Sequence, residues 1–183
     1  SEKAIKFGKS LGRDPSFMQL ILDESNEILS TEKNVIIVEH KLGYININAG
    51  IDRSNISKNK DLVLLLPENP KKSANDIQLQ ISSQLNKDIS VIITDSMTRP
   101  YRSGVTNFAI ASSNIQSLID LKGEEDIFGN ELHATEIAIA DELAAAAGLL
   151  MGQGNDMKPV VIIKGFDRSN YSVNNAYDLI VNK

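Results

Sequence analysis

The segment of residues 91–107, VIITDSMTRPYRSGVTN, combines the side chains that a site for a metal-bound phosphate requires. A β-branched apolar run ends at a carboxylate, Asp95, with a hydroxyl on each side, and two arginines, Arg99 and Arg102, follow around a proline. Carboxylates are hard ligands for divalent cations, and planar guanidinium groups bind phosphate through two hydrogen bonds. A structural role for Asp95, as a cap or a strand-end hydrogen-bond partner, explains the carboxylate equally well but leaves the arginines unexplained.

An acidic loop and a glycine-rich turn offer further polar groups. Asp52 lies in the segment D-R-S-N, which is good chemistry for an Asx turn or a helix cap, and local sequence slightly favours that structural interpretation. The turn GQGN (Gly152–Asn155) follows a long apolar helix, and its first glycine is typical of a helix C-cap. A helix cap does not explain the second glycine or the two amide side chains. A glycine turn of this kind can direct several backbone N–H groups toward phosphate oxygens. The turn matches neither a P-loop nor a dinucleotide-binding fingerprint.

Gly148 in the alanine-rich helix predicted over Thr135–Met151 suggests close packing of the helix backbone. Three carboxylates fall in the same helix. Glu136 suits the positive end of the helix dipole. Asp141 and Glu142 are adjacent, so at least one faces the buried side and needs a partner, for which an arginine is the simplest choice. We interpret all three as structural pairs rather than catalytic groups, and nothing near His133 suggests a triad.

Composition excludes several kinds of site. The chain has no cysteine, which excludes disulfides, thiolate metal sites and cysteine nucleophiles, and its two histidines leave little scope for a zinc site. The net charge of −5 and the absence of a basic run argue against a nucleic-acid partner. No apolar run approaches the roughly 20 residues of a membrane span, and no signal-peptide pattern occurs, so we expect no membrane partner and a cytoplasmic location.

Hydrophobic periodicity predicts helices and strands that mix without a strict βαβ rhythm, which favours an α+β fold with mixed, largely antiparallel sheets. The predicted helices are Glu2–Leu11, Pro15–Leu29, Lys71–Leu85 and the buried Thr135–Met151. The predicted strands are Val35–Glu39, Tyr44–Asn48, Leu62–Leu66, Ile89–Thr94, Phe108–Ala111 and Pro159–Lys164. The length of 183 residues fits one domain, and we expect residues 1–183 to be a C-terminal part of a longer protein because Ser1 begins inside a predicted helix.

Six segments, in this order, resemble the coenzyme F420-0:gamma-glutamyl ligase family, which extends the tail of a deazaflavin coenzyme with glutamate. They are NAGIDRSN (48–55), LLPENPKKSA (65–74), TDSMTRPYRSGVTNFAIA (94–111), LKGEEDIFGNEL (121–132), TEIAIADELAAAAGLLMGQ (135–153) and VVIIKG (160–165). The chain departs from the family pattern at Thr98, Tyr101, Val105 and Asn107, where members usually carry Gly, Trp, Gln and Asp.

The resemblance implies a GTP-dependent ligase that joins L-glutamate to the deazaflavin precursor through a γ-linked amide, by way of an acyl phosphate. It implies a homodimer that uses Mg²⁺ or Mn²⁺, with K⁺ as a further cation. The implied metal ligands are Asp52, Asp95, Ser96 and Gln153. The implied nucleotide site contains Asn55, Gly152, Gly154 and Asn155, with Arg99 and Arg102 available to clamp phosphates or carboxylates. Two alternatives stay open: a binding module without turnover, and an amide ligase for another carboxylate.

Overall fold

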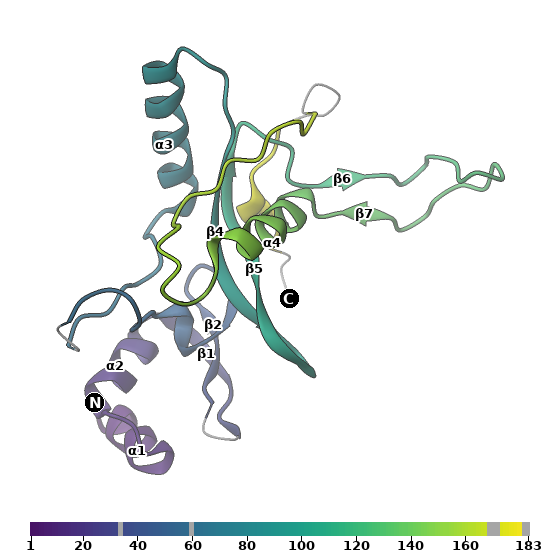
Figure 1. The fold of residues 1–183 in the computed structure, drawn as a ribbon. Coiled ribbons are helices and arrows are strands. Elements are labelled where there is room, and N and C mark those ends of the chain that lie inside the picture. The colour runs from purple at the N-terminus through teal and green to yellow at the C-terminus, as the bar shows by residue number, and fades with distance from the viewer. Residues whose placement is uncertain (33–34, 59–60, 168–172, 181–183) are drawn as a thin grey trace. The chain divides into compact units, whose positions relative to one another are not determined.

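The computed structural model describes residues 1–32, 35–58, 61–167 and 173–180 (Figure 1). The chain divides into two compact units, one made of Ser1–Leu66 and Met97–Gly104, the other of Pro67–Ser96 and Val105–Lys183. Both contain helices and small sheets with antiparallel pairing, so the predicted α+β class is confirmed. No described helix is long and apolar enough to cross a membrane.

Local sequence signals determine where the first helix of the first unit ends and where the second begins. Helix α1 (Glu2–Leu11) ends at Gly12, whose φ of 61° lies in the left-handed region that glycine adopts readily. Helix α2 (Pro15–Asp23) begins where the Asp14 side chain accepts a hydrogen bond from the Ser16 N–H, with proline in the first turn. The predicted extension of this helix to Leu29 is wrong, because Ser25–Ser30 forms strand β1 instead.

Strand β1 belongs to a three-stranded antiparallel sheet of order β1-β2-β3, with β2 at Ile37–His40 and β3 at Ile45–Ile47. Ile28 of β1 pairs with Val38 of β2, and this cross-strand partner explains why the apolar residues after Asp23 are extended rather than helical. The two strands predicted over Val35–Glu39 and Tyr44–Asn48 are thus present and form an antiparallel hairpin. Its buried face is partly polar, since Asn46 is 6% exposed and Ile45 53% exposed.

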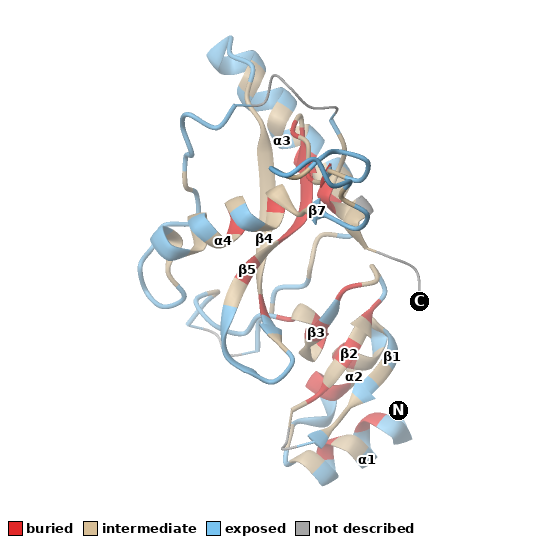
Figure 2. Cartoon of the chain, turned by 90° about the vertical axis from the view of Figure 1, so that its right-hand side faces the viewer, coloured by how far each residue is buried: buried red, intermediate tan, exposed pale blue. Residues whose placement is uncertain are grey.

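The core of the first unit lies between this sheet and its two helices, as the buried residues in Figure 2 show. Met18 and Ile21 of α2 pack with Val38 and the preceding Ile36, and all four are fully buried. A 3₁₀ turn, η2 (Asn48–Gly50), follows β3 and leads into the loop that carries Asp52. The described core therefore fixes the start of that loop.

The second unit is built on the long hairpin of β4 (Val91–Arg99) and β5 (Arg102–Ser113), both longer than the predicted strands. Helix α4 (Ile139–Met151) packs on β5 through Ala140 and Ala144, which contact Ala109 (Figure 1). Alanine side chains allow this close approach of helix to strand. The remaining helical elements are α3 (Pro70–Leu85), capped by Asn69, and the 3₁₀ turn η3 (Ala176–Leu179).

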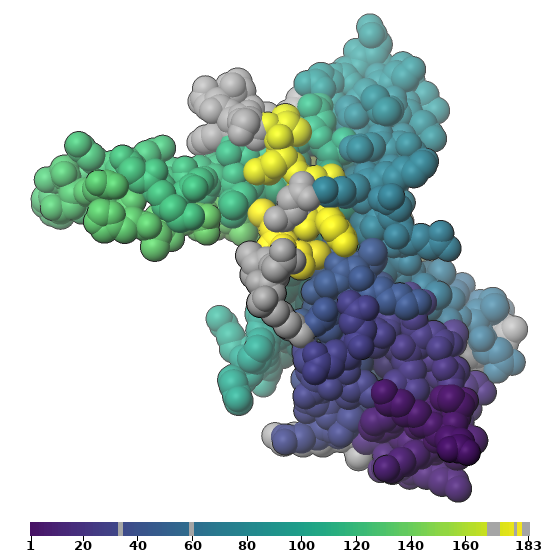
Figure 3. Space-filling view, turned by 180° about the vertical axis from the view of Figure 1, so that it is seen from behind, coloured from purple at the N-terminus to yellow at the C-terminus, as the bar shows by residue number. Residues whose placement is uncertain are grey.

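Residues 119–137 form an arm that projects from the second unit (Figures 1 and 3). Its base is the antiparallel pair of β6 (Ile119–Asp120) and β7 (Glu136–Ile137). The alanine-rich helix consequently begins at Ile139 and not at Thr135, since Glu136 and Ile137 pair with β6 before the helix starts. The charged segment 121–131 between these two strands is largely loop.

Three apolar segments differ from the structure that the sequence predicts for them. The expected buried strand Leu62–Leu66 makes only an isolated bridge from Leu64 to Asp52, and Pro159–Lys164 forms no strand, with Val160 78% exposed. Helix α4 is buried along its alanines but leaves Leu149 87% exposed. An apolar run becomes a buried strand only when a pairing partner and a covering layer exist. The described residues give Leu62–Leu66 a single bridge and give Pro159–Lys164 no strand partner.

Candidate polar site at the β4–β5 hairpin and the glycine turn

Asn107 of β5 joins three elements of the second unit. Its Oδ1 accepts a hydrogen bond from Nε2 of Gln153 at 2.9 Å, and its Nδ2 donates to Oγ1 of Thr94 at 3.3 Å. A Cβ atom built on Gly148 would lie 2.7 Å from the Asn107 side chain. The prediction that Gly148 marks a close approach is therefore confirmed, and it is the Asn107 amide that α4 approaches.

The glycine turn after α4 is held by its own side chains. Gly152 ends the helix with φ 75° and ψ −179°, a region that only glycine adopts freely, rather than the left-handed helical cap expected from sequence. A Cβ on Gly152 would lie 2.0 Å from Oδ2 of Asp156, which also accepts a bond from the Gly154 N–H at 3.4 Å. Gln153 therefore lies between the end of α4 and the segment that the Asp156 carboxylate holds.

Asp95 and Ser96 are consecutive residues of the continuous strand β4. Successive side chains of a strand point to opposite faces, so Ser96 shares the face of Thr94, and Asp95 projects from the other face. An Oδ1 atom of Asp95 accepts a hydrogen bond from the Ser96 N–H at 2.8 Å. Within the second unit, the structure thus gathers Thr94, Asn107 and Gln153, with Ser96 on the same face of β4.

Asp52 and Asn55 lie in the first unit. Oδ1 of Asp52 accepts hydrogen bonds from both the N–H and the Oγ of Ser54, each at 2.8 Å. This is the Asx turn that local sequence favoured. Asn55 follows with φ 54°, the left-handed conformation that asparagine tolerates. The role of Asp52 as a metal ligand and that of Asn55 as a nucleotide contact stay predictions.

The two arginines lie at the tip of the β4–β5 hairpin, among the residues Met97–Gly104 that belong to the first unit. Arg99 donates from Nη2 to the carbonyl oxygens of Ser103 and Gly104, at 3.1 and 3.4 Å, and so braces the hairpin turn. Its buried Nε has no acceptor among the described residues. Arg102 is exposed. Binding of phosphate by either arginine stays a prediction.

Two of the three carboxylates predicted to be structural, Asp141 and Glu136, have structural partners. Asp141 accepts a hydrogen bond from the Ala109 N–H at 2.9 Å, so its partner is a backbone amide rather than the expected arginine. Burial raises the pKa of Asp141, and the Ala109 N–H partly opposes that shift. Glu136 pairs with Lys122 at 2.5 Å instead of a helix terminus. His133 is exposed and lies 3.7 Å from Glu131.

A buried histidine in the first unit escaped the sequence analysis. His40 accepts a bond at Nδ1 from the Leu42 N–H, 3.0 Å away, and its Nε2 lies 3.4 Å from Oε2 of Glu24. Burial lowers the pKa of His40, and the Glu24 carboxylate partly opposes this. A single histidine at a strand end carries no sequence signal of burial. Asn107 did stand out in the sequence as a departure from the family pattern, but nothing in the sequence indicated its contact with Gln153.

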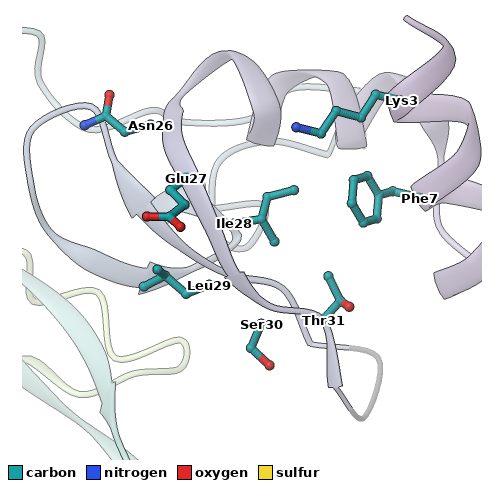
Figure 4. A pocket seen from close by; sticks show the side chains of 8 residues that line it. All are labelled: Lys3, Phe7, Asn26, Glu27, Ile28, Leu29, Ser30 and Thr31. Carbon is teal, nitrogen blue, oxygen red and sulfur yellow. The ribbon is translucent and has the colours of Figure 1, made fainter.

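An open hollow of about 480 Å³ lies in the first unit between α1 and β1 (Figure 4). Phe7 and Lys3 of α1 face Ile28 of β1 across it. The remaining lining residues are Asn26, Glu27, Leu29, Ser30 and Thr31. None of the predicted site residues lines this hollow, so it is separate from the polar groups of the hairpin and the glycine turn.

The donor chemistry of the predicted metal ligands suits a hard divalent cation. Two carboxylates, a hydroxyl and an amide carbonyl are all oxygen donors, and such sets bind Mg²⁺ or Mn²⁺ with retained waters. Nε2 of Gln153 is engaged with Asn107, and Oε1 has no hydrogen-bond partner among the described residues. No cluster of three or more His, Cys, Asp or Glu side chains suited to a metal occurs in the described part of the chain.

Comparison with known proteins gives one consistent result. A sequence model of the family described as F420-0:Gamma-glutamyl ligase matches residues 1–165. Proteins named coenzyme F420:L-glutamate ligase are similar to the chain: that of Methanocaldococcus jannaschii is 47% identical over 165 residues, covering 90% of this chain. Those of Methanococcus maripaludis and Archaeoglobus fulgidus are 48% and 38% identical over 164 and 167 residues, covering 90% and 91% of this chain. The chain spans 65% or 66% of the length of these three relatives.

Proposed function

Because the chain belongs to the F420-0:gamma-glutamyl ligase family, we propose that the protein containing it adds L-glutamate to the deazaflavin coenzyme precursor. The observation that carries the proposal is the match of residues 1–165 to the family, together with 47% identity to a relative named coenzyme F420:L-glutamate ligase. The relative's name supplies both the acceptor class and the amino acid.

We further propose that the reaction uses GTP and proceeds through an acyl phosphate. A carboxylate is a poor acyl donor, so its oxygen first attacks the γ-phosphorus of GTP and GDP leaves. The amine of glutamate then attacks the acyl carbon, loses a proton, and expels inorganic phosphate as the amide forms. In such transfers the protein mainly positions the reactants and stabilises charge. A divalent cation would neutralise phosphate charge when bound.

In this proposal, polar groups of the chain bind the divalent cation, the nucleotide and the reacting carboxylate. Asp52, Asp95, Ser96 and Gln153 would hold divalent cations through oxygen atoms, with K⁺ as a further predicted cation. Asp95 would serve the face of β4 opposite to that of Ser96. The backbone of the glycine turn (Gly152, Gly154 and Asn155) and Asn55 would contact the nucleotide. Arg99 and Arg102 would contribute positive charge near phosphates or carboxylates, for which a planar fork is well suited.

The activity assay uses the full-length protein with deazaflavin precursor, L-glutamate, GTP and Mn²⁺. The proposal predicts a product heavier by glutamate units and a matching release of GDP, both detected by mass spectrometry. Saturable nucleotide binding in a calorimeter without any GDP release would favour the alternative of a binding module. GTP consumption that depends on a different carboxylate would favour a ligase with another acceptor.

The assignment of the metal ligands is tested by Asp52→Asn and Asp95→Asn. Each change removes one negative charge but keeps the size and an oxygen acceptor, and the Asx turn of Asp52 tolerates asparagine. Mn²⁺ affinity of the full-length protein is expected to fall in both variants, with unchanged circular dichroism. Asp76→Asn on α3, an exposed aspartate paired with Lys72, is the charge-matched control. Unaltered affinity in both test variants would return the two aspartates to a purely structural role.

A homodimer of two-fold symmetry is also proposed, and exposed apolar side chains support it. On α3 these are Ile77, Leu79, Ile81 and Leu85, and on α4 they are Leu149 and Leu150. Leaving such residues in water is unfavourable, and a second copy would cover them at about 25 cal/mol per Å² of apolar area buried. Light scattering of the full-length protein at micromolar concentration is expected to give twice the chain mass, and a monomer mass would contradict the proposal.

A further inference from the structure

We propose that Asn107 is a positioning residue that holds the carboxamide of Gln153 with its oxygen directed toward a bound cation. This inference rests on the proposed function, because it takes Gln153 as a metal ligand. The role of Asn107 is argued from the contacts that its side chain makes in the second unit.

Both polar atoms of the Asn107 side chain have a defined partner. Oδ1 accepts from Nε2 of Gln153 at 2.9 Å, and Nδ2 donates to Oγ1 of Thr94 at 3.3 Å. Asn107 is only 8% exposed. Rotating the Asn107 amide alone by half a turn would set Nδ2 against the donating Nε2 of Gln153, so the bond to Gln153 itself opposes that rotation.

The bond to Asn107 decides which end of the Gln153 carboxamide is available. A carboxamide has one donor end and one acceptor end, and Asn107 engages the donor end. The acceptor, Oε1, has no partner among the described residues. An amide carbonyl oxygen is a suitable ligand for Mg²⁺ or Mn²⁺, whereas the NH₂ group is not. Asn107 therefore selects the ligating end of Gln153.

Packing fixes both members of this pair. The Asn107 side chain fills the space left by Gly148, where any Cβ would lie only 2.7 Å from it. The backbone of Gln153 is constrained by Gly152, which lies against the Asp156 carboxylate. Groups that orient a metal ligand in this way typically change metal affinity by about 10- to 100-fold when removed.

The test measures Mn²⁺ binding to the full-length protein from the electron paramagnetic resonance signal of free Mn²⁺. Asn107→Leu removes both hydrogen bonds at similar volume and is expected to weaken Mn²⁺ binding by about 10-fold or more. Asn107→Asp keeps an acceptor for Gln153, since the Thr94 hydroxyl can rotate to donate, and is expected to bind Mn²⁺ at least as tightly as the parent protein. Equal loss in both variants, or in neither, would overturn the inference.

A double-mutant cycle separates an effect through Gln153 from general damage. Gln153→Met removes the ligating oxygen, and adding Asn107→Leu to it is expected to cause no further loss of Mn²⁺ affinity. Additive losses would mean that Asn107 acts by another route and would overturn the inference. If Gln153→Met alone left Mn²⁺ affinity unchanged, both the inference and the assignment of Gln153 as a ligand would fall, while the glutamate-ligase assay would still judge the reaction by itself.

A second variant keeps the inference testable if Asn107→Leu does not fold. Thr94→Val removes the partner of Asn107 Nδ2 with little change of volume, so the Asn107 amide can turn. Mn²⁺ affinity is expected to fall in the same direction but by less than in Gln153→Met. Circular dichroism monitors the fold of each variant, and full Mn²⁺ affinity in a folded Thr94→Val variant would count against the orienting role.

Discussion

Asp141 gives the sharpest test of how α4 is attached to β5, because a hydrogen bond joins its half-buried carboxylate to a buried amide. The Ala109 N–H donates to Oδ1 of Asp141 at 2.9 Å, and Ala109 itself is buried. Asp141→Ala leaves that amide without an acceptor, which costs about 1–3 kcal/mol of unfolding free energy.

Asp141→Asn separates the hydrogen bond from the charge. Asparagine retains an oxygen acceptor for the Ala109 N–H, so the cost of an unpaired amide does not arise. Burial raises the pKa of Asp141 above its ordinary value of 3.8, which means that the folded protein resists ionisation of this group. Below pH 3.8 the carboxyl is protonated in both states and causes no loss. As the pH rises through 3.8 and the raised folded pKa, the unfolded state ionises more readily and the parent protein loses stability.

The assay is urea unfolding followed by circular dichroism, from about pH 3.5 to about pH 7, for the parent protein and both variants. The stability of Asp141→Asn relative to the parent is expected to increase over this range and then become constant. Asp141→Ala is expected to be less stable than Asp141→Asn at every pH by the cost of the unpaired amide. Equal destabilisation by the two substitutions, or a parent-to-Asn difference that does not change with pH, would refute the reasoning.

Two further predictions concern backbone strain and a buried histidine. Gly152→Ala is expected to reduce the free energy of unfolding by about 1–3 kcal/mol in thermal or urea unfolding, because φ is 75° and the new Cβ would meet the Asp156 side chain. Gly154→Ala is the control that should be tolerated, since Asp156 lies no nearer than 3.8 Å to a Cβ at that position. Burial lowers the pKa of His40, so its contribution to stability is complete above pH 6.5 and is lost as the pH falls from 6.5 through the lowered folded pKa. The melting temperature of the parent protein should therefore fall more steeply below pH 6.5 than that of His40→Gln, and parallel profiles would contradict this account.

Features that depend on neighbouring residues were predictable from the sequence alone. Gly12 ends α1 and Asp14 caps α2, because helix termini are satisfied by groups within a few positions. The Asx turn of Asp52 belongs to the same class, since its acceptor and donors lie two residues apart. The small Gly148 also indicated a close contact correctly, although the sequence could not identify Asn107 as the group in contact.

Features that depend on partners far along the chain were decided only by the tertiary structure. Ser25–Ser30 is a strand because β2 pairs with it, whereas Pro159–Lys164 has the same apolar character and finds no strand to pair with in the described residues. The bonds of Gln153 to Asn107 and of Ala109 to Asp141 span 46 and 32 residues. Local sequence determines where a segment can bend or begin, but hydrogen-bonding and packing partners are chosen by the folded chain as a whole, because only folding brings distant groups within bonding distance.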